Sequence, residues 1–283
     1  MIRVLITGAG SYIGTNIASE LLKEPELFEV QELDVRNGLD EQAFQGFDAV
    51  LHVAGIAHQR ETEENAPLYR SVNRDLAVNA ARAAKKMGVK QFVFFSSMSV
   101  YGMTTGRIHK DTQPAPNTHY GVSKWEAEQE LAKLSDDSFR IAVLRPPMIY
   151  GKGCRGNYPR LASLAGKLPF FPYVHNERSM LYIGTLAAFV RRLLLSAQGG
   201  LYFPQNREYV STCDLVKEVA ACHGKRVLFV RGFQWLLHAV SARVGVIGKV
   251  FGTLTYDHDM SMAFANEDEL SFEETIRLTE AGQ

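Results

Sequence analysis

The sequence predicts an α/β fold in which a doubly wound parallel sheet is joined to a smaller C-terminal lobe. Two observations predict the sheet: short aliphatic runs alternate with longer helical patterns through the first half of the chain, and a glycine-rich turn follows the first run directly. Such alternation is typical of parallel strands covered by helices on both faces. With 283 residues, 46% of them hydrophobic, the chain can bury one large core or a core with a smaller lobe.

Five aliphatic runs in the first half are the predicted strands of the sheet. In chain order they are residues 3–7, 28–35, 49–55, 91–97 and 140–147. Residues 14–24 and 73–88 have helical periodicity, and the second stretch ends on Gly88, a residue that suits a helix stop. Only one predicted strand separates the glycine-rich turn from residues 49–55, whereas a full doubly wound sheet usually has two.

The second half of the chain has a looser pattern. After Pro147 come segments rich in glycine, proline and aromatic residues, then a predicted helix at about 183–197, a strand at 201–203, a helix from near Ser211 and a strand at 226–230. We therefore divide the chain into a first domain over residues 1–150 and a second lobe formed mainly by residues 151–283, with some later elements packing back on the sheet.

Composition and charge exclude several classes of function. Lysine plus arginine equals aspartate plus glutamate at 31 each, so no net positive field favours nucleic acid or an acidic membrane surface. Cys154, Cys213 and Cys222 form an odd set without CxxC spacing, so we expect no disulfide framework. His52 and His58 lack the spacing of metal ligands, and we expect no metal site.

Two segments bear on where the protein works. The chain passes straight from its first residue into a predicted strand, without a charged leader and apolar segment, so we expect a cytoplasmic protein. Residues 233–252 are apolar but are interrupted by Arg243 and Lys249, so they lack the unbroken run of about 18 that marks a membrane span. We predict a buried or lobe-capping helix there, with an interfacial helix or an oligomer contact as the alternative.

The first strand is followed by TGAGSYIG, residues 7–14, which places Gly8, Gly10 and Gly14 before a helix. Glycines let the backbone approach a pyrophosphate closely, and a helix N-terminus presents unpaired N–H groups and a positive dipole end. This context predicts a dinucleotide site, with a turn that binds no ligand as the alternative.

The choice of dinucleotide depends on residues near the end of the second predicted strand. Asp34 lies about 20 residues after Gly14, where a carboxylate can accept hydrogen bonds from the ribose hydroxyls of NAD and repel the extra phosphate of NADP. Arg36 could instead bind that phosphate, and because a strand is missing, Asp34 could belong to the loop that contacts adenine. The sequence favours NAD, with NADP as the alternative.

The stretch HYGVSKWEAEQEL, residues 119–131, places Tyr120 and Lys124 on one face of a predicted amphipathic helix. An ammonium beside a phenol favours the phenolate and can lower its pKa by roughly 1–3. The pair is therefore a candidate acid/base site, and a solvated helix face is the alternative. Ser97 ends the strand predicted at 91–97, at the edge where ligands of open α/β sheets gather.

Five motifs occur in an order that resembles the extended short-chain dehydrogenases/reductases. They are TGAGSYIG at 7–14, taken as a TGxxGxxG motif, HVAG at 52–55, FFSSMSVYG at 94–102, YxxxK at 120–124 and RPPMIYGKG at 145–153. The resemblance covers roughly residues 1–200 and is nearest to the nucleotide-sugar 4-epimerases and 4-keto reductases. It implies a Rossmann-type NAD(P)-binding domain over 1–150, a substrate-binding lobe mainly over 151–283, a UDP-linked sugar as substrate and a homodimer. The short second-strand region and the tail from 257 to 283 depart from the family.

The residues and the resemblance together assign roles to a set of positions. Tyr120 is the expected general acid/base, Lys124 the cation that lowers the tyrosine pKa and binds the nicotinamide ribose, and Ser97 the hydroxyl that orients the substrate. The expected cofactor-binding residues are Gly8, Gly10, Ser11, Tyr12, Ile13, Gly14, Asp34, Val35, Arg36, Val53, Ala54, Gly55, Asn73, Tyr120, Lys124 and Pro146, and the expected substrate-binding residues are Ser97, Ser99, Tyr120, Asn157 and Arg178. Structural alternatives are a helix start at Asn73 and an ion pair of Arg178 with Glu177.

The loop after Ser97 separates activities within the family. Nucleotide-sugar dehydratases of this type need an Asp-Glu pair directly after the hydroxyl residue, and this chain has Met98 and Ser99 there. Neither side chain exchanges a proton usefully at neutral pH, so dehydration is disfavoured. An NAD-dependent nucleotide-sugar 4-epimerase is the first hypothesis, an NAD(P)H-dependent 4-keto reductase the second, and a non-catalytic protein that senses a dinucleotide the third.

Overall fold

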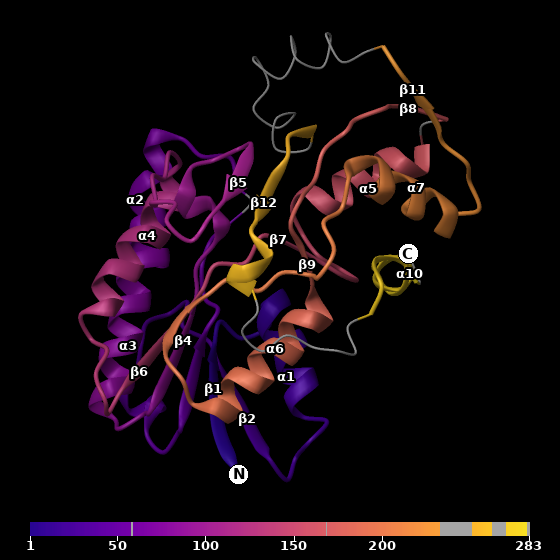
Figure 1. Cartoon of the computed structure of the whole chain (residues 1–283). Helices are drawn as coiled ribbons and strands as arrows, with labels where there is room; N and C mark the ends of the chain where they lie inside the picture. Colours follow the sequence, from indigo (N-terminus) through magenta and orange to yellow (C-terminus); the bar gives the residue numbers. More distant parts are fainter. Residues whose placement is uncertain (58, 168, 233–250, 262–269, 282–283) are drawn as a thin grey trace.

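The computed structural model describes residues 1–57, 59–167, 169–232, 251–261 and 270–281, and it confirms the α/β fold (Figure 1). The central sheet is six-stranded, with the order β2-β1-β3-β4-β6-β10, and every neighbouring pair is parallel. Its strands are β1 (Ile2–Thr7), β2 (Phe28–Leu33), β3 (Ala49–His52), β4 (Gln91–Phe95), β6 (Arg140–Leu144) and β10 (Gly200–Tyr202). The chain leaves β1 toward β2 on one side and returns to β3 on the other, so the direction of winding changes at the carboxyl end of β1.

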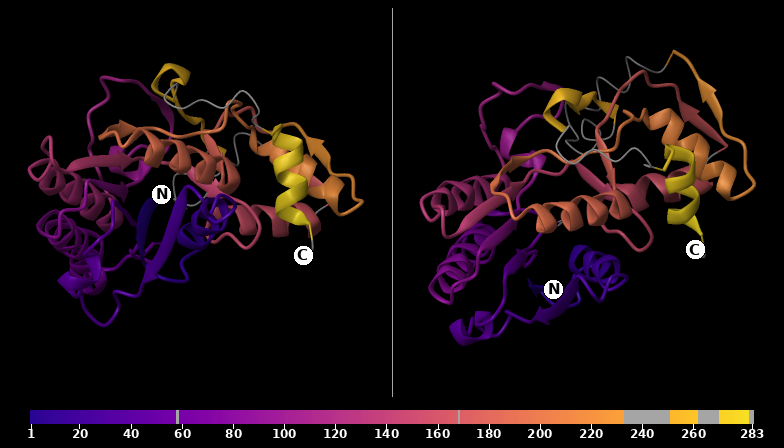
Figure 2. Two further views of the ribbon diagram at one scale, coloured as in Figure 1. Left: turned by 90° about the horizontal axis from the view of Figure 1, so that it is seen from below. Right: turned by 60° about the horizontal axis from the view of Figure 1, so that its bottom comes forward.

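Helices cover both faces of this sheet (Figures 1 and 2). One face packs on α1 (Tyr12–Leu21) and α6 (Ile183–Ser196), and the other on α3 (Leu76–Lys86) and α4 (His119–Ala132). Within β1, Val4 and Ile6 face the first pair of helices and Leu5 faces the second, and all three side chains are fully buried. Burial on both faces explains why β1, β3 and β4 have nearly continuous apolar runs, whereas the edge strand β2 carries exposed polar residues.

The strands end earlier than the sequence predicted. The predicted runs 28–35, 49–55, 91–97 and 140–147 stop in the structure at Leu33, His52, Phe95 and Leu144. The residues beyond these ends leave the ladder and form the loops along one edge of the sheet. They include the positions at which the sequence placed the candidate site.

The helix predicted over 73–88 begins earlier in the structure. Residues 66–86 form a continuous helical run of α2 (Ala66–Tyr69), a π-helical segment η3 (Arg70–Asp75) and α3. Pro67 lies in its first turn, a position where the missing N–H has no cost. The proposed helix start at Asn73 is therefore wrong, because Asn73 lies in the middle of this run.

The second lobe has its own core (Figure 2). Helices α5 (Asn157–Lys167), α7 (Thr212–Cys222) and α10 (Phe272–Glu280) surround it. Apart from the central sheet, the described strands form three parallel pairs: β7 (Met148–Tyr150) with β9 (Met180–Tyr182), β8 (Phe170–Pro172) with β11 (Leu228–Val230), and β5 (Gly106–Ile108) with β12 (Leu254–Tyr256). The 3₁₀ turns are η1 (Glu41–Phe44), η2 (Glu63–Asn65), η4 (Met98–Tyr101) and η5 (His258–Ser261). Helix α6 packs on one face of the central sheet, and β10 pairs with β6 at its edge.

Strand β12 makes two of the contacts that attach the lobe to the rest of the molecule. Strand β12 pairs with β5, which follows the loop after β4, and the Tyr256 hydroxyl donates to the Arg145 carbonyl at 2.9 Å. Apart from Phe251 and Gly252, the predicted apolar helix over 233–252 lies outside the described residues. Among the helices that are described, none is long and apolar enough to cross a bilayer.

Candidate active site

The glycine-rich loop passes directly over the end of β3. Gly8 has φ +97°, and a Cβ there would lie 2.9 Å from the backbone N and Cα of Ala54. Any side chain would therefore push apart the ends of β1 and β3. This close approach confirms the tight turn that the sequence predicted, and turns of this kind bind a pyrophosphate in dinucleotide-binding folds.

The middle position of a TGxxGxxG motif is Ser11 in this chain, which is a departure from that pattern. Ser11 has φ −72° and ψ 148° and is the N-cap of α1, where its Oγ accepts a hydrogen bond from the Gly14 amide at 3.2 Å. A Cβ on Gly14 would lie 2.7 Å from that Oγ, so the glycine makes room for the cap. The backbone here is compatible with any residue, and the serine satisfies one helix amide itself.

Replacing Ser11 with alanine is expected to lower the free energy of unfolding by about 1 kcal/mol, because an N-terminal amide of α1 loses its acceptor. Ser11→Gly should lower the free energy of unfolding by only about a few tenths of a kcal/mol, since glycine leaves the amide open to water. Urea denaturation of the three proteins measures the difference. Equal midpoints for wild type and Ser11→Ala would contradict the capping role.

The end of β2 carries two carboxylates in different surroundings. Glu32 Oε2 accepts a hydrogen bond from the Gly10 amide at 2.7 Å, which fixes its side chain against the glycine loop. Asp34 is instead bound to Arg36: the guanidinium Nε lies 3.0 Å from each carboxylate oxygen and Nη2 lies 2.6 Å from Oδ2. The Arg36 side chain holds the pKa of Asp34 at about 2.

The sequence reasoning missed Glu32. The signal was present, because Glu32 comes 18 residues after Gly14 and fits the spacing used for Asp34 as well. Strand register decides between them: Leu33 is the last residue of β2 and its carbonyl accepts from the Gly8 amide at 2.9 Å, so Glu32 lies at the level of the loop and Asp34 beyond it. Val35, another expected contact, has its side chain buried.

The loop after β3 joins the glycine turn to α4. Asn73 is fully buried, and its amide bonds both polar atoms of the Ile56 backbone, at 2.8 and 3.1 Å, and the Ser123 hydroxyl at 3.2 Å. A Cβ on Gly55 would lie 2.9 Å from Asn73 Oδ1 and 3.5 Å from Lys124 Nζ. Residues 53–55 thus touch the glycine turn at one end and the predicted Tyr–Lys pair at the other.

Lys124 lies at the carboxyl ends of the central strands. It is 5% exposed, its Nζ donates to the Phe95 carbonyl at 2.7 Å, and it sits 4.7 Å from the centre of the Phe94 ring. This burial excludes a solvated helix face. Tyr120, one turn earlier, is partly buried and hydrogen-bonds Ser97, which is the N-cap of η4. The structure therefore brings together the three residues predicted to carry the chemistry.

The electrostatic effect on the tyrosine is opposite to the prediction. Burial raises the pKa of Tyr120 to about 12, and the hydrogen bond from Ser97 offsets only part of that rise. The ammonium of Lys124 points to the Phe95 carbonyl, and burial lowers the pKa of Lys124 itself to about 8. In this structure the loss of hydration therefore outweighs the attraction expected from a cation one helical turn away.

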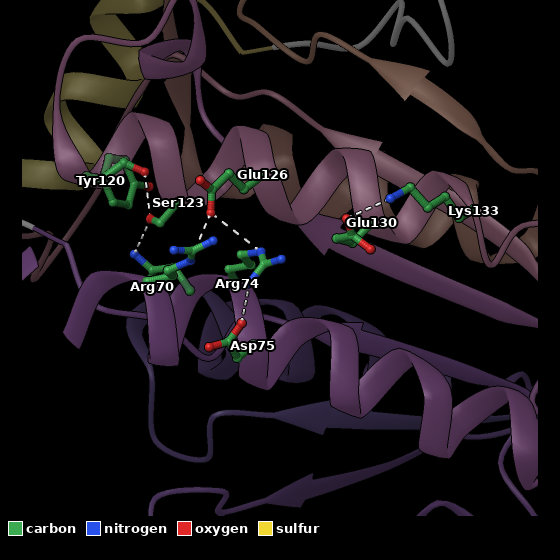
Figure 3. A network of polar contacts seen from close by, with 9 residues as sticks. Arg70, Arg74, Asp75, Tyr120, Ser123, Glu126, Glu130 and Lys133 are labelled. Atoms are coloured by element: carbon green, nitrogen blue, oxygen red, sulfur yellow. Dashed lines mark hydrogen bonds and ion pairs between the residues drawn. The ribbon is translucent and has the colours of Figure 1, made fainter. Parts of the chain in front are cut away.

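The face of α4 that carries Glu126 packs against residues 66–86 (Figure 3). Glu126 Oε2 lies 3.3 Å from the Nε atom of Arg70 and 3.5 Å from that of Arg74. Nearby, the Ser123 hydroxyl donates to the Tyr120 carbonyl at 2.8 Å. Partly exposed ion pairs of this kind contribute only about 0–1 kcal/mol each, so Glu126 is expected to have little effect on the placement of α4.

Two neighbours of Tyr120 had no signal in the sequence. The Glu61 carboxylate accepts from the His119 amide at 2.6 Å, at the N-terminus of α4, and the Tyr69 ring meets the Tyr120 ring edge-on at 6.5 Å between centres. Both come from the segment between β3 and α3, which lacks the spacing of any known motif. On the other side, the Pro146 carbonyl accepts from the Met98 amide at 3.0 Å and Ser99 is exposed, hydrogen-bonded to Ser97.

The other two predicted substrate-binding residues, Arg178 and Asn157, lie in the second lobe. Arg178 comes shortly before β9. Arg178 exchanges backbone hydrogen bonds with Val210, and its Nη1 donates to the Gly252 carbonyl at 2.7 Å. The alternative ion pair with Glu177 is absent among the described residues, because that carboxylate lies 3.6 Å from Arg107 instead. Burial lowers the pKa of Arg178 to about 10, which leaves it a cation at neutral pH. Asn157 is the first residue of α5.

Other chemistry has little support in the part of the chain that the structure describes. It contains no group of histidine, cysteine and acidic side chains that could hold a metal ion, and all three cysteines are free thiols. His52 is fully buried beside Thr7, with Nδ1 and Oγ1 2.8 Å apart, and burial lowers the pKa of this imidazole to about 3.

The Tyr12 ring lies between the sheet and the loop after β7, where a Cβ on Gly151 would lie 2.6 Å from its hydroxyl.

Comparisons with known proteins agree with this arrangement. The sequence matches the NAD dependent epimerase/dehydratase family over residues 4–201. A UDP-glucose 4-epimerase of Vibrio cholerae is 30% identical over 90% of this chain and 87% of its own length. An N-acetyl-α-D-glucosaminyl-diphospho-ditrans,octacis-undecaprenol 4-epimerase of Escherichia coli O157:H7 is 29% identical over 79% of this chain and 73% of its own.

Solved structures share the fold over the whole chain. A UDP-glucuronic acid 4-epimerase from Bacillus cereus in complex with NAD has a TM-score of 0.78 at 19% identity, covering 99% of this chain and 96% of its own. A dTDP-4-dehydrorhamnose reductase from Bacillus anthracis in complex with NADP has a TM-score of 0.76 at 23% identity, covering 99% of both chains.

Proposed function

Because the chain belongs to the NAD-dependent epimerase/dehydratase family, we propose that it is an NAD-dependent 4-epimerase of nucleotide sugars, with a UDP-hexose or UDP-N-acetylhexosamine as substrate. One observation carries the proposal: Ser97, Tyr120 and Lys124 lie together at the carboxyl end of β4, beside the loop of residues 53–55 over which the glycine turn passes. Ligands of open α/β sheets bind at this point of the fold. The Vibrio cholerae relative is named for the same reaction type.

In this proposal the chain's own residues bind the sugar and move one proton. Tyr120 removes the proton of the sugar 4-hydroxyl as a phenolate, Ser97 orients that hydroxyl, and Lys124 supplies positive charge beside them. Bound nicotinamide would supply the hydride acceptor and donor for C4, so that no reductant would be consumed. The ketone must rotate in the site so that its other face receives the hydride, and Tyr120 then gives the proton back to the 4-oxygen.

Arg178 is the residue proposed to bind the diphosphate of the substrate. It is a cation and largely buried, and among the described residues its guanidinium donates to the Gly252 carbonyl. A guanidinium recognises phosphate oxygens through paired donors. A diphosphate occurs in nucleotide sugars and in polyprenol-linked sugars, the substrate class named for the Escherichia coli relative. Asn157 and the rest of residues 151–283 are proposed to form the surrounding substrate lobe.

For the cofactor we propose NAD. Glu32, held against the glycine loop, is in a position to accept hydrogen bonds from ribose hydroxyls, and its charge disfavours a phosphate there. Arg36 would favour NADP, but its guanidinium is bound to Asp34. Asp34 thus acts in this proposal by occupying Arg36 rather than by contacting the ribose.

Releasing Arg36 should change the preference. Asp34→Ala is expected to raise the affinity for NADPH by about 10-fold, near the lower end of what a charge-assisted hydrogen bond contributes, with little change for NADH. Fluorescence titration of both dinucleotides measures the effect. The double variant Asp34→Ala/Arg36→Met is the matched control and should lose the gain; a gain that persists in it would contradict the role of Arg36.

The pH dependence follows from the two pKa values. With the pKa of Tyr120 near 12, the phenolate fraction should rise about tenfold per pH unit below that value, and with the pKa of Lys124 near 8, its ammonium is lost above pH 8. We expect kcat/KM to increase between pH 6 and 8 and to stop increasing near pH 8. A pH–rate profile checks this, and activity that falls from pH 6 to 8 would contradict the assignment.

The function is tested by incubating the protein with UDP-glucose, UDP-N-acetylglucosamine and polyprenyl-diphosphate N-acetylglucosamine in separate reactions, without added reductant. NMR should detect the C4 epimer of one of them. The 4-keto reductase is the second candidate, favoured by the likeness in fold to a dTDP-4-dehydrorhamnose reductase. No epimer, together with oxidation of NADPH by a 4-keto nucleotide sugar, would replace the first candidate with the second. A homodimer is proposed from the family, and light scattering would give its mass.

A further inference from the structure

The end of β4 and helix α4 are joined by polar contacts from successive residues. The Phe95 carbonyl accepts from Lys124 Nζ at 2.7 Å, and Ser97 hydrogen-bonds Tyr120. Between them, the Ser96 hydroxyl donates to the carboxylate of Glu128. Tyr120, Lys124 and Glu128 are spaced four residues apart and share one face of α4, so each turn of the helix makes one contact with the strand end. The first two belong to the proposed proton-transfer site, and the third has no role there so far.

Glu128 is itself held from the neighbouring strand. Arg145, the first residue after β6, places Nε 3.0 and 3.1 Å from the two carboxylate oxygens and Nη2 2.6 Å from Oε2, and both side chains are at least nine-tenths buried. Nη1 of the same guanidinium donates to the Tyr101 hydroxyl at 2.7 Å, and its centre lies 5.4 Å from the Trp125 ring. The carboxylate thus connects α4 to the ends of β4 and β6 directly, and to η4 through Arg145.

A buried ion pair is poor evidence for stability, because removing two charges from water costs about as much as their attraction returns. Apolar side chains of similar volume would fill the same space and would leave Ser96 to find another partner. They would not fix the helix in one register, since apolar contacts are non-directional. A carboxylate with several directed partners does fix it, and the two residues whose separation depends on that register are Ser97 and Tyr120.

We infer that Glu128, clamped by Arg145, is a positioning residue that holds Tyr120 and Lys124 of α4 in register with Ser97 at the end of β4. The inference rests on the proposed function, since it assigns Glu128 a task only if Tyr120 and Lys124 carry out proton transfer. Glu128 touches neither substrate nor dinucleotide in this assignment and acts through its two helix neighbours.

The charge of Glu128 has a second consequence. Burial lowers the pKa of Lys124, and the Glu128 carboxylate one turn away raises it again. The other titratable groups facing Lys124 in the described chain are Tyr120 on α4 and His52 at the end of β3, which burial keeps neutral; β4 offers the Phe94 ring and the Phe95 carbonyl. Without the carboxylate, Lys124 should therefore lose its proton at lower pH.

The test compares Glu128→Gln with Glu126→Gln, the same substitution on the face of the same helix that is partly exposed and meets Arg70 and Arg74. Two profiles are measured for each protein between pH 6 and 10: kcat/KM for the sugar diphosphate, and the dissociation constant of NADH from fluorescence. In Glu128→Gln, kcat should fall by about 10²-fold, the loss typical of a misplaced catalytic group, and the break near pH 8, where Lys124 loses its proton, should move to lower pH by about one unit in both profiles. Glu126→Gln should match wild type in both.

Because Glu128→Gln leaves Arg145 charged and buried, the variant Glu128→Gln/Arg145→Gln is measured beside it. It removes both charges and should show the same direction of shift, since Glu128 is the group that raises the Lys124 pKa. Lower kcat with both profiles unmoved would reduce Glu128 to a structural role and overturn the inference. Wild-type protein that binds no NADH would overturn the proposed function instead, so the two failures are distinguishable.

Discussion

Tyr120→Phe is expected to lower kcat by about 10²–10⁴-fold while NADH still binds and the protein stays folded. The substitution removes only the hydroxyl that takes and returns the proton, and it keeps the ring that packs edge-on against Tyr69. Its partner Ser97 retains the Ser99 amide and hydroxyl as hydrogen-bonding neighbours, so η4 keeps its cap. Steady-state kinetics, fluorescence titration with NADH and a melting curve measure the three properties.

The matched control is Tyr202→Phe, the same change on the edge strand β10. That hydroxyl donates to the carbonyl of Gly199, just before β10, at 3.0 Å. Its kcat should stay within about twofold of wild type, because the change keeps the buried ring in place and alters none of the three residues proposed for proton transfer. Activity of Tyr120→Phe within tenfold of wild type would refute the role of the phenol.

Arg178→Met is expected to raise KM for the sugar diphosphate by about 10–100-fold, which is the contribution of a hydrogen bond to a charged group. Methionine keeps much of the aliphatic stem and removes the guanidinium, so the loss reports on charge and paired donors. NADH binding should not change, because Arg178 belongs to the lobe and not to the glycine crevice. Kinetics with increasing substrate and a parallel NADH titration separate the two effects.

Arg82→Met provides the control for the loss of one positive charge, since Arg82 is exposed on α3. If both variants raise KM equally, the effect is one of net charge. If neither does, the diphosphate is bound elsewhere and the assignment of Arg178 fails.

The fold could be predicted because its signals are local and repeated. Each central strand is buried on both faces and so appears as a continuous aliphatic run, and the turn after β1 needs glycine at residue 8, where Ala54 leaves no space for a Cβ. The bounds were less accurate where polar residues carry tertiary contacts. The helical run from Ala66 was missed because the segment η3 that follows α2 is rich in polar side chains that meet α4 and the loop after β3.

The candidate site was predicted only as a set of residue types. Sequence spacing placed Tyr120 and Lys124 on one face, but it gave no information on burial, and burial decides the direction of the tyrosine pKa. Likewise, spacing alone did not distinguish Glu32 from Asp34, because the choice depends on where β2 ends and on which side chain Arg36 binds. Glu128 was invisible for the same reason, since its partner Arg145 comes from a different strand.

The most direct test of the central claim follows an isotope. The accepted sugar diphosphate is prepared with deuterium at C4, incubated with the protein in ordinary water without added reductant, and analysed by mass spectrometry and NMR. If hydrogen leaves C4 as hydride and returns while Tyr120 handles only the hydroxyl proton, the C4 epimer should keep its deuterium, and Tyr120→Phe should form it at least about 10²-fold more slowly. An epimer that has exchanged deuterium for solvent hydrogen would show that C4 is deprotonated instead, and would contradict the account.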